Sequence, residues 1–177
     1  MKKVVVALAL SLALTACKED VASVVVPVEM TDDALGHYCQ MFVADHPGPK
    51  AQVHLKGRAE PLWFSQVSDA VAYMHDPERE MEITAVFVSD MSHAESWSMP
   101  GIANWQAAET AFLVIESDQL GGMGVPEALP FSRREDATAF VADRGGRLVQ
   151  WGDVPESYVR PAEIGMSGHA GDRELMQ

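Results

Sequence analysis

The stretch from Gly36 to Met41 holds three side chains that can bind a metal ion. His37, Cys39 and Met41 follow one another at two-residue steps. In an extended segment, residues at positions i and i+2 point to the same side, so these three would present an imidazole, a thiol and a thioether together. Thiolate and thioether are soft donors that favour Cu(I) over Zn(II), Mg(II) or Ca(II). The pattern predicts a Cu(I) site, although a Cys-x-Met tripeptide alone is more often part of a hydrophobic core.

The first residues are typical of an exported lipoprotein. A positive start precedes an apolar run at residues 4–14, which is too short to span a bilayer as a helix. The run ends in Leu14-Thr15-Ala16-Cys17, which is similar to a bacterial lipobox. We therefore expect residues 1–16 to be removed as a signal peptide and Cys17 to carry the acyl chains of a periplasm-facing anchor. Lys18, at the next position, favours the outer over the inner membrane.

Cys39 is then left as a single free thiol in an oxidising compartment. The chain has two cysteines, and the lipid occupies Cys17, so no disulfide can form within the chain. A leftover cysteine is a buried filler, an intermolecular partner or a reactive ligand. A thiol-dependent enzyme with Cys39 as nucleophile and His37 as base is one alternative, and a structural lipoprotein that holds a partner is another. We expect no enzyme, because neither alternative uses the spaced methionine together with the lone thiol and the lipid.

The composition excludes one class of partner. Among 177 residues, 26 are acidic and 13 are Lys or Arg, which gives a formal net charge of -13. A nucleic-acid-binding protein needs a basic surface for the phosphate backbone, and no basic segment is visible here. The hydrophobic fraction of 47% is sufficient for a packed core.

An internal repeat predicts the fold. Residues 60–74 align with residues 127–141 at a constant offset of 67, with seven identities in fifteen positions. In both copies an apolar strand is followed by a serine, Ser65 or Ser132, which we expect to cap a helix; Ser132 and Glu135 form a capping box. With the flanking strands, each copy is a strand–strand–helix–strand unit, so the predicted fold class is α+β with two related small units.

The repeat also sets the expected domain limits. These are a signal peptide (1–16), a lipidated cysteine and tether (17–31), a first unit with the Cys-x-Met site (32–89), a second unit (90–160) and a polar tail (161–177).

Two further segments contain sulfur. The segment 90–99, which joins the units, holds Met91, His93 and Met99, but a flexible linker rarely makes a tight site. Met123 lies between glycines, where a side chain without a packing role is expected to be exposed. Strand geometry favours His37 as the third copper donor, and the exposure of Met123 favours a second thioether.

Several of these segments together resemble the NosL family, the accessory lipoproteins for maturation of nitrous-oxide reductase. The resemblance is carried by "GHYCQMFVADHPGPK", "AQVHL", "NWQAAETAFLVIESD" and "GGMGVPEALPF". Its strongest pieces are Cys39-x-Met41, Pro47-Gly48-Pro49-Lys50 and Gly122-Met123-Gly124. Family members commonly have Cys-Gly-Met, whereas this chain has Gln40 between the two sulfur residues.

The resemblance implies a copper chaperone built from two similar α+β units. Cu(I) would be bound by Cys39 and Met41, and the place of Met123 in the family pattern favours it over His37 as the third donor. The copper would serve the catalytic copper–sulfide cluster of nitrous-oxide reductase. The partner would be that enzyme or its maturation transporter complex, and the process would be denitrification.

Overall fold

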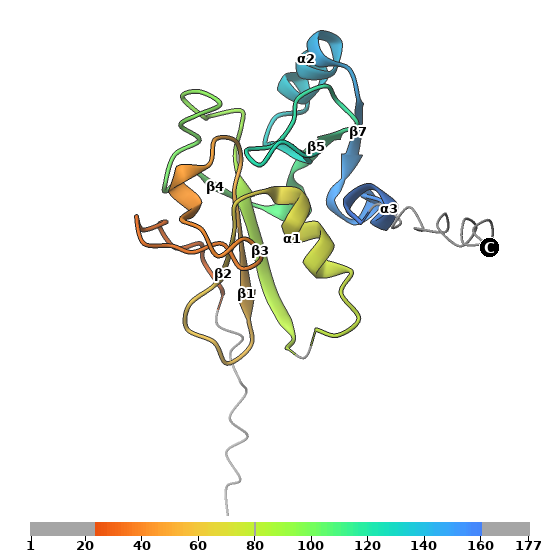
Figure 1. Cartoon of the computed structure of the whole chain (residues 1–177). Coiled ribbons are helices and arrows are strands. Elements are labelled where there is room, and N and C mark those ends of the chain that lie inside the picture. The colour runs from red at the N-terminus through yellow and green to blue at the C-terminus, as the bar shows by residue number, and fades with distance from the viewer. Residues whose placement is uncertain (1–23, 80, 161–177) are drawn as a thin grey trace, which may run out of the picture.

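Two antiparallel sheets, each with one main helix, make up the described part of the chain (Figure 1). This computed structural model describes residues 24–79 and 81–160. The first sheet has four strands in the order β2-β1-β3-β4, and α1 connects β2 to β3. Its elements are β1 (Ala51–Leu55), β2 (Leu62–Phe64), α1 (Val67–Met74), β3 (Ile83–Ser89) and β4 (Trp105–Ala107).

The second sheet has three strands in the order β6-β5-β7, and α2 connects β6 to β7. Its elements are β5 (Phe112–Ile115), β6 (Leu129–Phe131), α2 (Arg134–Arg144) and β7 (Arg147–Gln150). The remaining short turns are η1 (Val43–Asp45), η2 (Ala108–Thr110), η3 (Trp151–Asp153) and α3 (Glu156–Val159). Within residues 24–79 and 81–160, no helix has the length and apolar character needed to cross a membrane.

The internal repeat is visible in the positions of the elements. Strands β2 and β6 start 67 positions apart, and so do helices α1 and α2. In both units the central strand, β1 or β5, pairs with the strands on either side of the helix. The prediction of an α+β fold with two related units is therefore confirmed.

The domain limits stay a prediction. Strand β4 lies beyond position 90 but pairs with β3, so the first sheet reaches past the expected boundary. The expected signal peptide, Cys17 and the polar tail lie outside the described residues.

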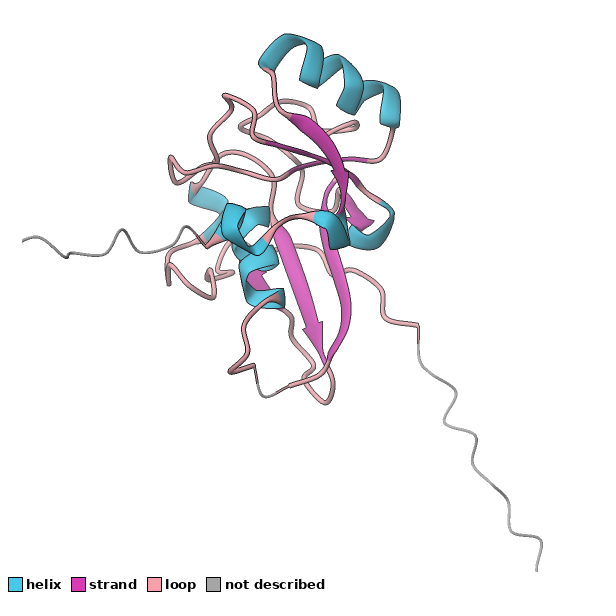
Figure 2. Cartoon of the chain, turned by 90° about the vertical axis from the view of Figure 1, so that its right-hand side faces the viewer, coloured by secondary structure: helices cyan, strands magenta, loops and turns pink. Residues whose placement is uncertain are grey.

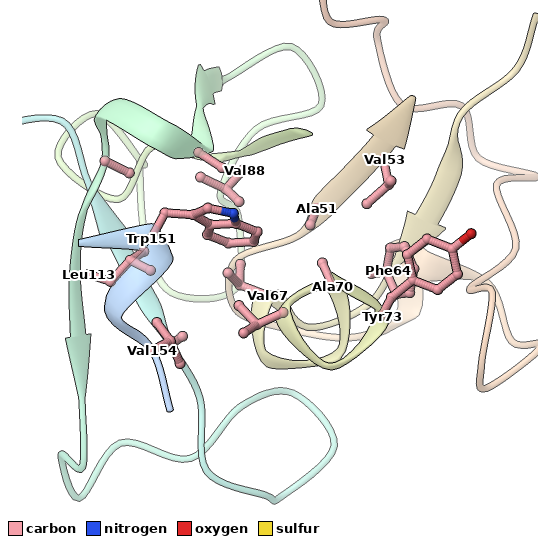
Figure 3. Packing of buried hydrophobic residues seen from close by; sticks show 14 of the residues in the cluster. Ala51, Val53, Phe64, Val67, Ala70, Tyr73, Val88, Leu113, Trp151 and Val154 are labelled. Atoms are coloured by element: carbon pink, nitrogen blue, oxygen red, sulfur yellow. The ribbon is translucent and has the colours of Figure 1, made fainter. Parts of the chain in front are cut away.

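The two units share one hydrophobic core (Figure 3). Its members come from β1, β2, α1 and β3 in the first unit and from β5, β7 and η3 in the second. Trp151 and Leu113 of the second unit face Val67 of α1 across this core. Because the apolar faces are buried against each other, the junction between the units is part of the folded interior.

The two helices differ in their exposure. Six of the eight residues of α1 are buried, because this helix lies between its own sheet and the second unit. Helix α2 lies at one end of the molecule (Figure 2), and only Ala137 among its residues is buried. The start of α1 is therefore the helix end that lies at the junction.

The predicted serine caps are wrong. The helices start at Val67 and Arg134, one residue later than a serine cap requires, and neither N-cap residue makes a side-chain hydrogen bond. The hydroxyl of Ser65 instead approaches the Cys39 sulfur, and that of Ser132 approaches His93.

Carboxylates distant in sequence bind the amides at the helix starts instead. Glu127 Oε1 accepts a hydrogen bond from the Ser68 amide in the first turn of α1, at 2.8 Å. Asp90, which directly follows β3, accepts one from the Ser132 amide just before α2, at 3.0 Å. A carboxyl oxygen at a helix N-terminus satisfies an amide that has no partner within the helix. Local sequence does not reveal these caps, because the donors and acceptors lie 59 and 42 positions apart.

Candidate metal site

Residues 35–42 form a tight loop, the Cys39 loop, which carries Cys39 and Met41. A backbone bridge closes its ends. Inside it, the Gly36 amide donates to the Met41 carbonyl and the Gln40 amide donates to the Gly36 carbonyl, both at 2.9 Å. Its centre is a turn, so the extended segment expected from the sequence is wrong. The two-residue spacing therefore does not place the three side chains on one side of a strand.

Gln40 makes this turn possible with a left-handed backbone. Its φ is 56°, a region that glycine enters without strain and other residues rarely adopt. The side-chain amide of Gln40 donates to the carbonyls of Gly36 at 3.2 Å and His37 at 2.7 Å. These hydrogen bonds offset the backbone strain, so Gln40 adopts a conformation that glycine would take. It stands where members of the family that the sequence resembles commonly have glycine.

The Cys39 thiol is held against the end of β2. Its sulfur lies 3.4 Å from the hydroxyl oxygen of Ser65, which directly follows β2. Gly36 is also in close contact, because an added Cβ there would collide with the sulfur and lie 3.0 Å from the same hydroxyl. Cys39 is a free thiol of intermediate exposure. The sulfur is thus positioned by close neighbours but still reachable from solvent.

Residues 120–126 form a second tight loop, the Met123 loop, between β5 and β6. A backbone bridge closes its ends, and Gly121 both donates to the Val125 carbonyl at 2.8 Å and accepts from the Gly124 amide at 2.9 Å. Met123 is 38% exposed, which agrees with the exposure expected from its flanking glycines.

Both loops contact the β2–α1 connection. The Met123 amide donates to the side-chain oxygen of Gln66 at 3.1 Å, and Gln66 directly follows the Ser65 that contacts Cys39. Gly122 packs so closely on Pro47 that an added Cβ would overlap the Pro47 carbonyl oxygen. Loops from different units are therefore anchored on two consecutive residues.

His37 is placed differently. Its ring packs in an aromatic cluster, with centroid distances of 5.1 Å to Tyr38, 5.6 Å to Phe64 and 5.4 Å to Tyr73. Burial, assisted by the positive charge of Arg58, lowers the pKa of this imidazole. The packing gives this ring a structural role within the Cys39 loop.

A different imidazole comes closer to being a free donor. His46 Nε2 is buried and has no hydrogen-bond partner among the described residues, and the His46 side chain borders Gly122 of the Met123 loop. The sequence alone does not distinguish this residue from a surface histidine. Its position five residues after Met41, directly before the rigid Pro47 turn, was the available signal.

A buried lysine ties the segments together. Lys50 is 2% exposed, and its ammonium donates to the carbonyls of His46 at 2.6 Å, Pro47 at 3.1 Å and Ser65 at 3.4 Å. Burial lowers the pKa of Lys50 to about 8, while negative charge at Glu127 and Cys39 acts in the opposite direction. All three donors of the ammonium are used, so Lys50 is a structural cation beneath the Cys39 thiol.

Glu127 is the buried acid on the other side of the junction. It is 1% exposed, and burial raises the pKa of its carboxyl to about 8. One oxygen accepts from the amides of Ser68 and Ala128, and the other is buried without a partner among the described residues.

The segment between the units offers no comparable arrangement. The His93 ring is hydrogen-bonded to Asp90 at 2.6 Å, and Met99 is 54% exposed. Met91 packs against a smaller apolar cluster of the second unit, which includes Leu129 and Phe131. In residues 24–79 and 81–160, no three His, Cys, Asp or Glu side chains gather where they could hold one ion. The candidate site is therefore the sulfur set of Cys39, Met41 and Met123.

Comparison with known proteins agrees with the fold. The NosL family model matches residues 27–159, a range that contains both loops. The chain is 48% identical to the copper-binding lipoprotein NosL of Achromobacter cycloclastes over 178 residues, covering 99% of this chain and 92% of that protein. It is 28% identical to the copper-binding lipoprotein NosL of Stutzerimonas stutzeri over 170 residues, covering 93% and 87%.

A solved structure has the same fold. The crystal structure of the copper chaperone NosL from Shewanella denitrificans matches with a TM-score of 0.70 and 28% sequence identity. The match covers 75% of this chain and 97% of that one.

Proposed function

Because the chain belongs to the NosL family, we propose that it is a periplasmic copper-binding lipoprotein that receives Cu(I) and passes it on. The acceptor is nitrous-oxide reductase, or the transporter complex that matures it, and the copper enters the catalytic copper–sulfide cluster. Cys39, Met41 and Met123 are the proposed donors, and Cys17 carries the lipid.

The anchoring of both loops on the β2–α1 connection supports this proposal. The Cys39 loop, which also carries Met41, contacts Ser65 through its thiol, and the Met123 loop is bonded to Gln66 through a main-chain amide. Sulfur donors of this kind favour Cu(I). The side chains of Met41 and Met123 are 43% and 38% exposed, so ligands of an acceptor can reach the metal and replace them one at a time.

Charge also favours a monovalent ion. A thiolate neutralises the charge of one Cu(I), whereas a divalent ion with the same ligands keeps a net positive charge. The ammonium of Lys50 is buried beneath the thiol, and a like charge in the interior is unfavourable. The site therefore selects Cu(I) against Zn(II) through both donor softness and charge.

The metal assignment is tested by anaerobic titration of the mature chain with Cu(I) against a competing chelator. One equivalent should bind, and Cys39→Ala should lose at least about 100-fold in affinity because the anionic donor is removed. Met41→Ala should lose less, because water or an added thiol can take its place. Met99→Ala, which removes an exposed methionine of the joining segment, is the matched control. Unchanged affinity in both the Cys39 and the Met41 variant would contradict the assignment.

The anchor is tested separately. Cys17→Ala should prevent lipidation and leave the precursor uncleaved or released from the membrane. Its copper affinity should equal that of the lipidated protein, because Cys17 lies before the described fold that holds the proposed donors. Recovery of this variant with a normal mature membrane anchor would contradict the lipid assignment.

The delivery role is tested in a strain that lacks this protein. When copper is scarce, the reductase polypeptide should accumulate without its catalytic copper–sulfide cluster. The Cys39→Ala protein should fail to restore the cluster, and the Met99→Ala protein should restore it. A fully metallated reductase in the deletion strain under these conditions would refute delivery.

A further inference from the structure

Three buried polar side chains lie beneath the two loops, and we call them the buried polar layer. They are Lys50, Gln66 and Glu127, each no more than 2% exposed. Polar groups are costly to bury, so three of them at one junction require a compensating arrangement. One of their hydrogen bonds, from the Met123 amide to Gln66, reaches a proposed copper donor directly, and others hold the backbone on either side of Gln66.

Gln66 serves the Met123 loop. Its side-chain oxygen accepts the Met123 amide at 3.1 Å. The same oxygen borders Gly121, where an added Cβ would lie 2.5 Å from it and 2.9 Å from Glu127 Oε2. The Met123 loop is therefore seated directly on the carboxamide, with space for a glycine only.

Lys50 and Glu127 hold the residues around Gln66. Lys50 donates to the carbonyl of Ser65, the residue before Gln66. Glu127 accepts from the amide of Ser68, two residues after Gln66. The backbone at Gln66 is thus fixed on both sides by buried charged or acidic groups. Its side chain consequently has a defined direction.

We propose that Gln66 is a positioning residue for copper, which holds the Met123 loop in register with Cys39 so that the Met123 thioether can complete the site. This inference rests on the proposed function, because it needs Met123 to be a donor. Gln66 does not touch the metal itself; it acts through the main chain of Met123. Groups that orient metal ligands in this way typically change affinity by about 10- to 100-fold when they are removed.

A double-mutant cycle tests the proposal. Cu(I) affinity is measured for the mature chain and for Gln66→Leu, Met123→Ala and the double variant. Each single variant should bind about tenfold more weakly, and the double variant should be no weaker than Met123→Ala. Copper X-ray absorption should show one sulfur neighbour fewer in Gln66→Leu than in the parent. A merely structural role would leave the number of sulfur neighbours unchanged.

Gln52 provides a matched control. It is also fully buried, and its carboxamide binds the main chain of Val28 in both directions at 2.9 Å, away from both loops. Gln52→Leu should destabilise the fold but leave copper affinity and the sulfur count unchanged.

A second variant keeps the test valid if Gln66→Leu does not fold. Gly121→Ala pushes against the Gln66 carboxamide without removing it and should lower Cu(I) affinity. Adding Met123→Ala to this variant should cause no further loss beyond that of Met123→Ala alone. Gly152→Ala, whose added Cβ meets nothing within 4 Å, should have no effect. The inference would be overturned if the losses of affinity of the two single variants multiplied in the double variants. Unchanged affinity in Gln66→Leu and Gly121→Ala would also overturn it. Failure of the parent chain to bind Cu(I) would instead overturn the proposed function.

Discussion

Replacing the buried acid Glu127 with glutamine should stabilise the protein near neutral pH. Burial raises the pKa of the carboxyl from a reference value of 4.5 to about 8, against the opposing effect of the bonded Ser68 and Ala128 amides. The nearby Asp69 also raises the pKa and the charge of Lys50 lowers it. Between these two pKa values, the unfolded chain has an ionised Glu127 and the folded chain a protonated one.

The sign of the pH dependence follows from proton binding. The folded state binds more protons than the unfolded state in this window, so stability falls as pH rises from about 4.5 to about 8. Each pH unit in the window costs about 1.4 kcal/mol. From pH 5.5 to 7.5 the contribution of Glu127 should therefore fall by about 2–3 kcal/mol. A glutamine oxygen can still accept the Ser68 and Ala128 amides, and the side chain does not ionise.

The assay is urea unfolding of the parent chain and Glu127→Gln at several pH values. The difference in unfolding free energy should grow in favour of the variant by about 2–3 kcal/mol between pH 5.5 and 7.5. Taking the difference cancels the contributions of the other titrating groups. Glu60→Gln is the matched control, because Glu60 is the repeat equivalent of Glu127 but is exposed. A difference that stays constant with pH would refute the argument.

Three further predictions concern the loops. Gln40→Gly should leave the unfolding free energy within about 0.5 kcal/mol of the parent, because glycine accepts the left-handed φ. Gln40→Ala should lose about 1–2 kcal/mol, because the strain remains and two hydrogen bonds are lost. Equal urea midpoints for both variants would contradict this. Gly36→Ala should weaken Cu(I) binding by about tenfold, because its Cβ displaces the Cys39 sulfur, while Gly152→Ala serves as the control in the same chelator competition. Cu(I) affinity should rise with pH by up to about tenfold per unit, because one proton leaves per metal bound. A steeper slope at acid pH that disappears in His46→Ala would identify an imidazole donor in place of a methionine, and one that disappears in His37→Ala would identify that ring.

Sequence patterns were sufficient for the units and their elements. The apolar runs and the 67-residue repeat predicted every strand of both units except β4, and both main helices. They were sufficient because these features depend on local apolar alternation and on similarity between two segments of the same chain. The missed β4 has three residues, none of them buried, so it has no apolar pattern to detect.

The details of the site were less accessible. The turn at Gln40 depends on a left-handed backbone that a glutamine does not signal, so a strand was expected there. The burial of Lys50 was missed because a lysine after Pro-Gly-Pro is typical of an exposed turn, and its three carbonyl acceptors become adjacent only after folding. The donor residues were found from their chemistry, but their spatial relation depends on how the two units pack.

The long-range hydrogen bonds at the junction also determine the order in which parts of the chain can fold. The bond from Ser68 to Glu127 closes a segment of 59 residues, and that from Met123 to Gln66 closes one of 57. Contacts so distant in sequence form late, because loop-closure entropy must be overcome before they contribute. A chain that is still emerging from an export channel therefore exposes the Cys39 thiol well before the Met123 loop emerges. Full copper affinity should mark a completely folded chain, and a chain that ends before Gly121 should be restricted to the donors of the Cys39 loop.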